Sequence, residues 1–242
     1  MRILIISDIH ANLTALDAVL DDAPQVDAVW CLGDLVGYGP DPNECVKRVQ
    51  ALPNLVCLIG NHDAAVSGVI DTTSFNSEAR LAVLWTQSVI EQDNLDYLRG
   101  LSPQTEIDSV HLAHGSPRQP VWEYLLDTRT AFENFNYFDT PFCFVGHSHM
   151  PVVFRMEDKQ HTTDLSIPKA NSSLKMVPRA IYNPGSVGQP RDRDPRAAYA
   201  VFDSDRQTWS LQRVSYDIQS VQDRMRAARL PQRHIQRLSA GW

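Results

Sequence analysis

Five clusters of aspartate, asparagine and histidine each follow a short apolar run in this chain of 242 residues. They are Asp8-x-His10, Gly33-Asp34, Gly60-Asn61-His62-Asp63, His114-Gly115 and Gly146-His147-x-His149. Short apolar runs are typical of buried strands, and strand ends can bring side chains from distant parts of a sequence into one pocket. We therefore expect a sheet protein that carries a metal-binding site at its strand ends.

The spacing of the apolar runs predicts two sheets within one domain. Strands at 2–7, 28–32 and 55–59 alternate with helices at 12–22 and 43–51, which is typical of a mostly parallel sheet. Further strands are expected at 109–113, 142–145, 152–156, 181–183, 198–202 and 209–214, with a helix at about 77–90 and a final helix through Ile218, Val221 and Met225 before Pro231. We expect one domain over residues 1–242, with a helical insertion at about 64–105. The polar, irregular segment at 157–178 is expected to be a hairpin excursion or a mobile loop.

Composition excludes several classes of protein. With 43% apolar residues the chain can bury a sizeable core, and its formal charge of −7 argues against an extended nucleic-acid-binding surface. Its four cysteines include no C-x-x-C pair, so buried reduced thiols are expected. The apolar run at residues 3–6 is too short for a signal peptide or a membrane span. We expect a cytoplasmic protein that does not bind membranes.

Each cluster has an ordinary interpretation beside the metal-binding one. In an extended strand Asp8 and His10 would point to one side and chelate an ion, but a helix-capping Asp8 beside a solvated His10 fits that pair at least as well. Asp34 beside a glycine is ordinary turn chemistry. The cluster at 60–63 is more specific, because it places an amide oxygen, an imidazole and a carboxylate at a strand-to-loop turn. The cluster at 146–149 puts two imidazoles on one face by period two.

Taken together and in this order, the five clusters resemble the calcineurin-like metallophosphoesterase family over about residues 1–200. The turn Asn183-Pro184-Gly185-Ser186 also looks like the segment after the last ligand cluster in small bacterial members. The resemblance implies an α/β fold, a four-layer α/β/β/α sandwich of two mixed β-sheets with flanking helices. It also implies two metals, one held by Asp8, His10, Asp34 and His149, the other by Asn61, His114, His147 and the shared Asp34.

The chemistry of these side chains agrees with the resemblance. Imidazole, carboxylate and amide oxygen without thiolate suit two divalent transition-metal ions, manganese first, with iron, zinc, cobalt or nickel as alternatives. Two such ions with two carboxylates and a bridging hydroxide carry a charge of about +1, which favours an anionic phosphoryl group. We expect the hydroxide to attack phosphorus directly and His62 to protonate the leaving oxygen. Asp63 is expected either to hold His62 or to cap a helix or turn.

Other phosphatase chemistries are not supported. A cysteine-based phosphatase needs C-x5-R, but Asp63 stands at the arginine position after Cys57 and His149 stands there after Cys143. An aspartyl-phosphate enzyme usually shows D-x-D, whereas the first cluster is D-x-H. The remaining histidines, His111, His161 and His234, are expected to be structural or solvated.

Substrate recognition has to come from outside the metal ligands. The candidates are Arg191, Arg80, Tyr38 and Asn76, with the aromatic residues Phe75 and Trp85 near Asn76. The two arginines could clamp a second phosphate, and an aromatic ring could stack on a base. For any one of these residues, an ordinary surface or packing role is the more common one.

These observations predict a metal-dependent phosphoric ester hydrolase. We expect a small nucleotide-type substrate, such as a dinucleoside polyphosphate or a phosphodiester. The alternatives are a phosphoprotein (Ser/Thr) phosphatase and a non-catalytic protein-binding scaffold of the same fold. A nuclease is disfavoured because no basic stripe with interleaved aromatics accompanies the site.

Overall fold

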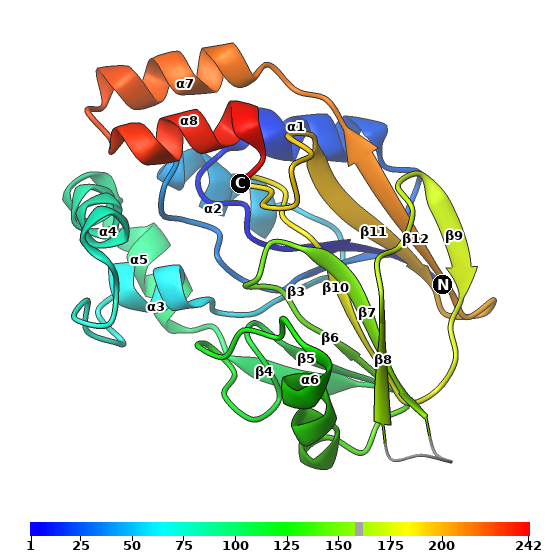
Figure 1. Ribbon diagram of the computed structural model, residues 1–242. Helices are drawn as coiled ribbons and strands as arrows, with labels where there is room; N and C mark the ends of the chain where they lie inside the picture. Colours follow the sequence, from blue (N-terminus) through cyan, green and yellow to red (C-terminus); the bar gives the residue numbers. More distant parts are fainter. Residues whose placement is uncertain (158–161) are drawn as a thin grey trace.

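The apolar run at the start of the chain forms β1 (Arg2–Ile6), which is buried on both faces. Leu4 packs on one side with Leu16 of α1 (Leu13–Asp22), whereas Ile5 packs on the other side against strands of a second sheet. The computed structural model describes residues 1–157 and 162–242. In it, β1 belongs to an inner layer of the molecule (Figure 1).

β1 lies in a mixed six-stranded sheet with the order β3-β2-β1-β11-β12-β9. Its other strands are β2 (Ala28–Cys31), β3 (Leu55–Cys57), β9 (Ser172–Lys175), β11 (Ala197–Asp203) and β12 (Thr208–Val214). β1, β2 and β3 are parallel, as the alternation of strands and helices predicts. Their carboxyl ends therefore point to one edge of this first sheet.

The second sheet is also mixed and six-stranded, with the order β4-β5-β6-β10-β7-β8. Its strands are β4 (Gln104–Ile107), β5 (Val110–Ala113), β6 (Phe142–Phe144), β7 (Pro151–Glu157), β8 (Thr162–Ser166) and β10 (Ala180–Pro184). β5, β6 and β10 are parallel. The loops after these three strands meet the loops after β1 and β2, since the Gly188 N–H donates to the Asp8 carbonyl at 3.0 Å.

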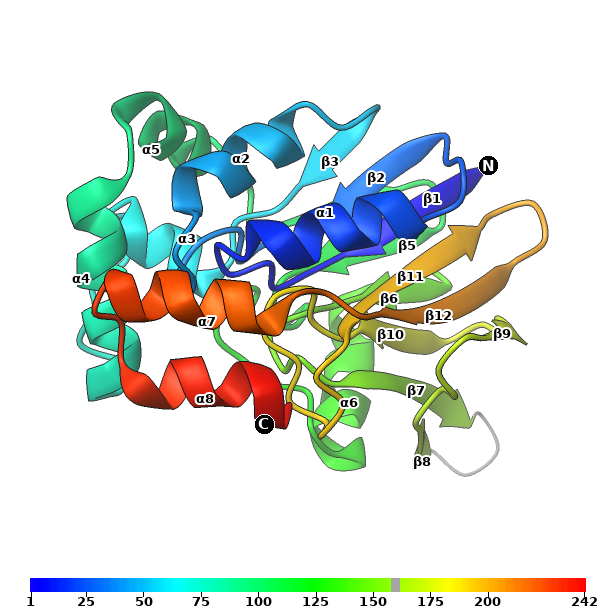
Figure 2. The ribbon, with the colours of Figure 1, turned by 90° about the horizontal axis from the view of Figure 1, so that it is seen from above.

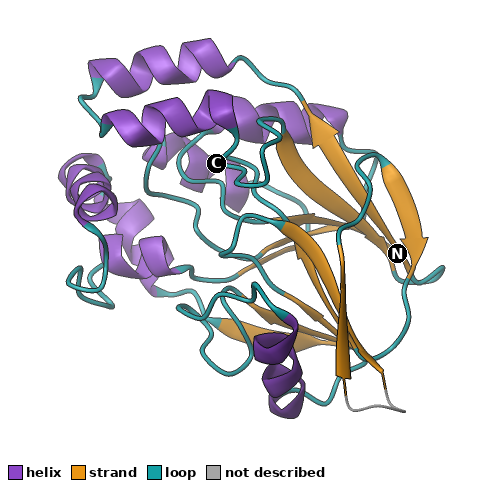
Figure 3. Ribbon diagram, in the orientation of Figure 1, coloured by secondary structure: helices purple, strands orange, loops and turns teal. Residues whose placement is uncertain are grey.

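Three apolar clusters separate four layers of secondary structure (Figure 3). The first lies between the first sheet and the helices α1 and α2 (Pro42–Gln50), and the second lies between the sheets, around Trp30 and Trp209. The third joins the second sheet to α6 (Thr128–Asn134), which continues into η1 (Phe135–Tyr137). This arrangement confirms the predicted α/β/β/α sandwich.

Five further helices lie around the sheets. α3 (Asn61–Val66), α4 (Ser77–Val89) and α5 (Gln92–Arg99) follow β3, and α7 (Ile218–Ala227) and α8 (Gln232–Ala240) form a hairpin beside α1 (Figure 2). The prediction that α7 is the last helix is wrong. Pro231 does not end the helical region; it stands at the start of α8, where a missing N–H costs nothing.

The polar segment at 157–178, expected to form a hairpin excursion or a mobile loop, contains β8 and β9 in its described part. β8 forms a hairpin with β7, and β9 crosses to the edge of the first sheet beside β12. The predicted residue His161 lies outside the described residues.

All four cysteines are free, and Cys31, Cys45 and Cys143 are buried. Within the described part of the chain, none of the helices combines the length and apolar character that crossing a membrane requires.

Candidate metal centre

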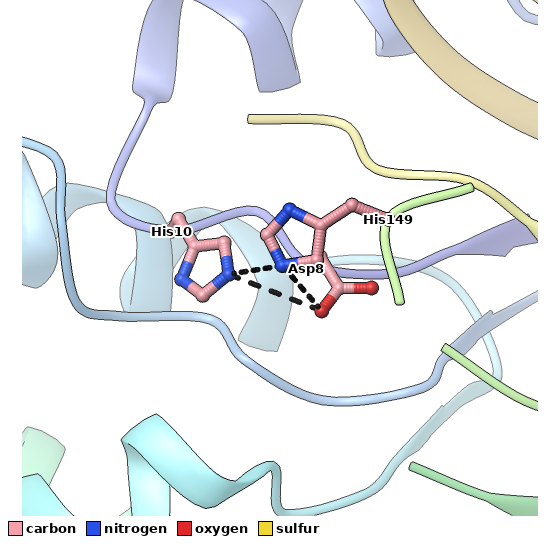
Figure 4. Close-up of side chains that lie close together, drawn as sticks. All are labelled: Asp8, His10 and His149. Atoms are coloured by element: carbon pink, nitrogen blue, oxygen red, sulfur yellow. Dashed lines mark hydrogen bonds and ion pairs between the residues drawn. The ribbon is translucent and has the colours of Figure 1, made fainter. Parts of the chain in front are cut away.

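Asp8, His10 and His149 meet in the loops that follow β1 and β6 (Figure 4). His10 Nε2 lies 3.1 Å from His149 Nε2, and Asp8 Oδ1 lies 3.4 Å from His149 Nε2 and 3.9 Å from His10 Nε2. All three side chains are buried. A carboxylate and two imidazole nitrogens that converge in this way form a potential cation site.

A second group brings together Asp34, His114 and His147, with Asn61 at its edge. His114 Nε2 lies 3.5 Å from Asp34 Oδ2 and 3.3 Å from Asn61 Oδ1. The same Asp34 Oδ2 lies 3.6 Å from His10 Nε2, which belongs to the first group. Asp34 therefore stands between the two groups.

Each of the four histidines in these groups is anchored by a main-chain carbonyl. His10 Nδ1 donates to the Val36 carbonyl at 3.1 Å. In the same way, His114 Nδ1 donates to the Leu32 carbonyl at 2.8 Å, and His149 Nδ1 donates to the Gln189 carbonyl at 2.6 Å. His147 is reversed, because its Nε2 donates to the Trp122 carbonyl at 3.2 Å and leaves Nδ1 free. Such a bond fixes the ring and, in a neutral imidazole, leaves the other nitrogen free to bind a metal. Despite its burial, His114 has a pKa raised to about 9 by the Asp34 carboxylate, so a cation would have to displace its second proton.

Five of the seven predicted ligands have a left-handed backbone. Their φ angles are 54° at Asp8, 49° at His10, 55° at Asp34, 63° at His147 and 60° at His149. The expectation that the first and last clusters continue extended strands is therefore wrong, because β1 ends at Ile6 and β6 at Phe144. Tight turns aim these side chains, and they send His147 and His149 into different groups. A non-glycine residue pays roughly 1–2 kcal/mol for this conformation, and such strain gathers at functional sites.

One buried carboxylate oxygen of the site lacks a partner that a cation would supply. Asp8 Oδ2 accepts the His147 N–H at 3.0 Å, but Asp8 Oδ1 has no hydrogen-bond partner among the described residues. Burial, together with the nearby Asp34 carboxylate, raises the pKa of Asp8 to about 7. Burial also opposes ionisation of Asp34, but the His114 imidazole beside it holds the Asp34 pKa well below its usual value. The residues present therefore fit divalent metal ions.

His62 faces the same space but is held differently. Its main-chain N–H donates to Asp34 Oδ1 at 2.9 Å, whereas its ring nitrogen Nδ1 is buried and has no partner in the described part of the chain. The ring packs edge-on against Phe75 (4.9 Å between centroids) and against Gly37, where an added Cβ would lie 2.5 Å from Nδ1. Burial lowers the pKa of His62 to about 4. Its ring comes within ligand reach of His10 and Asp34, but no carbonyl orients it.

Asp63 bonds with the main chain rather than with the ring of His62. Its Oδ2 accepts the Gly60 N–H and its Oδ1 accepts the Val36 N–H, both at 3.0 Å. Of the two roles expected for Asp63, the geometry matches the cap. The cluster at 60–63 begins helix α3 rather than a loop, and it passes so close to Asp34 that a Cβ on Gly60 would lie 2.0 Å from the carboxylate.

A cavity of about 190 Å³ opens over the two groups. Its walls are Asp34, Asn61, His62, His147 and His149 on the metal side, and Tyr38, Ser74, Phe75, Asn76, Ala79, Trp122, Tyr124 and Arg191 on the other. Three of the four predicted substrate residues therefore line it. Arg80 does not, because α4 turns it to the exposed surface, and Trp85 packs against the apolar cluster of the α7–α8 hairpin.

Sequence reasoning missed Trp122 and Tyr124. They lie two positions apart in the loop that follows the His114 cluster, and this placement of two aromatics after a ligand strand was a usable signal. It also missed the place of His234, which is buried beneath Tyr38 with 4.3 Å between the ring centroids. No feature of the sequence connects α8 with the turn that carries Tyr38.

Comparison with known proteins agrees with this geometry. The profile of the calcineurin-like phosphoesterase superfamily domain matches residues 1–207. The crystal structure of a metallophosphoesterase from Sphaerobacter thermophilus is 47% identical and has a TM-score of 0.92, covering 100% of this chain and 99% of that one. The chain belongs to the calcineurin-like phosphoesterase superfamily. It is a phosphoester hydrolase of a family that uses divalent metal ions.

Two relatives differ in how much of their length is shared. An uncharacterised protein of Methanocaldococcus jannaschii is 39% identical in an alignment of 246 positions, which covers 99% of this chain and 98% of that protein. A symmetrical bis(5'-nucleosyl)-tetraphosphatase of Erwinia tasmaniensis is 37% identical in an alignment of 103 positions, which covers 40% of this chain and 36% of that enzyme. The likeness to the tetraphosphatase is thus confined to part of both proteins.

Proposed function

We propose that the protein is a binuclear metal-dependent phosphoesterase that hydrolyses a phosphoester or phosphoanhydride bond in a nucleotide-type substrate. The position of Asp34 carries this proposal, because its Oδ2 faces His10 of one group at 3.6 Å and His114 of the other at 3.5 Å. A carboxylate shared by two groups suits a pair of cations. Asp8, His10, Asp34 and His149 would hold one cation, and Asn61, His114, His147 and Asp34 the other.

The cations would supply Lewis acidity and an activated water for direct attack on phosphorus. We propose manganese first, with iron, zinc, cobalt or nickel as alternatives, because the donors are imidazole nitrogens and oxygens without a thiolate. His62 would hydrogen-bond or protonate the leaving oxygen, since an anionic phosphoryl group beside it opposes the effect of burial on its pKa. Asp63 would contribute by fixing the turn that carries His62.

Arg191 supports a substrate with more than one phosphate. Its main-chain N–H donates to the His149 carbonyl at 3.4 Å, and its Nη2 donates to Gln189 Oε1 at 3.0 Å. These bonds place a guanidinium on the cavity wall next to a metal-side residue, where it can bind a second phosphate. The partial relative named as a tetraphosphatase acts on such a substrate by its name. We propose a dinucleoside polyphosphate or a nucleotide phosphodiester.

We also propose that residues 1–242 form one domain in which 64–105 is an insertion. Phe75 and Asn76 of this segment line the cavity, so the insertion would narrow the access of substrates. Its other predicted contact, Arg80, lies away from the cavity.

A turnover screen tests the proposed function. Protein loaded with manganese would be offered dinucleoside polyphosphates, cyclic nucleotides, mononucleotides and phosphopeptides. We expect the fastest turnover on a nucleotide class, loss of turnover with a chelator, and recovery when manganese is added back. A preference for phosphopeptides would favour a protein phosphatase instead. Full metal content without turnover of any class would favour a scaffold.

A further inference from the structure

Three aromatic side chains, Phe75, Trp122 and Tyr124, line one side of the cavity and are called the aromatic rim below. The rings of Phe75 and Trp122 meet edge to face, with 5.1 Å between centroids, and Phe75 also contacts His62. Tyr124 stacks on the ring of His147 with 3.9 Å between centroids. The aromatic rim thus extends from the proposed leaving-group histidine to a proposed metal ligand.

The loop that carries Trp122 and Tyr124 is held in place by polar contacts. Glu123, between them, accepts hydrogen bonds from Ser116 Oγ at 2.7 Å, Arg118 Nε at 3.2 Å and Asn134 Nδ2 at 2.7 Å. The Trp122 carbonyl anchors His147. A loop fixed in this way loses little conformational entropy when a ligand binds.

The cavity is too small to enclose a nucleotide. It measures about 190 Å³, whereas pockets for drug-sized ligands measure roughly 300–1,000 Å³. A phosphoryl group in the cavity would therefore leave the remainder of its molecule over the aromatic rim. There Tyr124 remains 44% exposed, and Phe75 and Trp122 are only partly buried. Partly exposed aromatic side chains of this kind can pack against a planar ring.

We propose that the aromatic rim binds a nucleobase whose attached phosphate occupies the cavity. This inference rests on the proposed function and goes further, because it assigns base recognition to the loop after β5 as well as to Phe75. Stacking on aromatic side chains tolerates every base, since each has a flat face. We therefore expect little discrimination among bases.

Calorimetric binding of two probes to the manganese-loaded protein tests the proposal. Adenosine 5'-monophosphate and ribose 5-phosphate carry the same phosphate and sugar, and only the first carries a base. We expect the adenine compound to bind at least roughly tenfold more tightly. Trp122→Ala and Tyr124→Ala should each reduce this advantage several-fold. The manganese content of both variants is measured as well, because Tyr124 stacks on His147. Trp122→Ala retains the main-chain carbonyl that anchors His147.

Tyr137→Ala provides the matched control, because Tyr137 is 54% exposed and does not line the cavity. It should leave the advantage of the adenine compound intact. Equal affinity of the wild-type protein for both probes would overturn the inference while sparing the proposed function. Phenyl phosphate that binds as tightly as the adenine compound would overturn the assignment to a nucleobase. If neither probe binds and the screen finds no turnover, the proposed function itself is wrong.

Discussion

The two walls of the cavity are built in opposite ways. The metal wall is built on the seven proposed ligands, all of which are buried, and their four histidines are bonded to main-chain carbonyls. The outer wall includes the buried Tyr38 and Ala79, but Arg191, Asn76 and the aromatic rim are partly or largely exposed and come from loops and a helix start. The metal wall is therefore fixed by the main chain of both sheets, whereas the outer wall can change without disturbing the sheets.

This comparison implies that changes in the metal wall remove chemistry and changes in the outer wall alter specificity. The largest effect is expected at Asp34, because it faces both groups. Asp34→Ala should lose both cations, and its turnover should fall by more than the roughly 10⁴-fold upper range for one acid–base residue. Elemental analysis of the purified variant, together with kcat, measures both results.

His10→Ala is the control for Asp34→Ala, because His10 lies in one group only. It should retain about one equivalent of metal, because Asp34 is proposed to hold both cations and His10 only one. Two retained equivalents in Asp34→Ala would mean that Asp34 does not hold both cations.

The second largest effect is expected at His62, which belongs to the cavity but not to the anchored histidines. His62→Asn should keep the metal content of the wild type and lower kcat by roughly 10²–10⁴-fold. The loss should shrink for a nitrophenolate leaving group, which needs no proton. Kinetics with a series of leaving groups measures this, and an equal loss for all of them would leave His62 only an electrostatic role.

A smaller, substrate-dependent effect is expected at Arg191 in the outer wall. Arg191→Ala should lower kcat/KM for a dinucleoside polyphosphate by roughly 1.5–3 kcal/mol, the value of a charge-assisted hydrogen bond. A small chromogenic phosphodiester should be affected much less. Arg80→Ala serves as the matched control and should change neither substrate, because Arg80 does not line the cavity. If Arg191→Ala lowers kcat/KM equally for both substrates, Arg191 does not act on specificity alone, and the division between the two walls fails at this residue.

The smallest effect is expected from pH, which should change the affinity of the metal wall for cations. The pKa of Asp8 is raised to about 7 before metal binds. Below that pH a proton occupies the Asp8 carboxylate, so metal affinity should rise with pH through 7. Between pH 6 and pH 8 we expect a gain of roughly tenfold from this one proton. The pKa of His114, which the Asp34 carboxylate raises to about 9 despite burial, should extend the rise above pH 8. Competition with a fluorescent chelator measures the affinity, and a flat profile between pH 6 and pH 8 would show that metal binding does not displace a proton from Asp8.

The sequence predicted the metal wall better than the outer wall, for a physical reason. Ligand chemistry restricts each position to a few residue types, and parallel strands deliver the ends of β1, β2, β5 and β6 to one place. Residue type and order were therefore enough to carry the family resemblance, and that resemblance assigned Asp8, Asp34 and His147 to the site. The same restriction does not apply to an aromatic or an arginine on a rim, and so Trp122 was missed and Arg80 was misplaced.

The local backbone of the metal wall was not predictable in this way. Reasoning from a period of two assumes extended strands, but the turns after Ile6 and Phe144 place non-glycine residues in the left-handed region, which such residues adopt in only a few per cent of cases. Helix α8 was missed because Pro231 was taken as a stop, although proline is equally acceptable at a helix start.

The left-handed backbone conformation of five proposed ligands also has an evolutionary consequence. Glycine in their place would adopt these conformations at lower cost, but it has no side chain with which to bind a metal. Variants selected only for resistance to heat should therefore accumulate such replacements at positions 8, 10, 34, 147 and 149 and lose catalysis. Selection for turnover should keep the strained residues and accept a less stable fold. The metal centre is thus where heritable improvement of stability and of activity conflict in this enzyme.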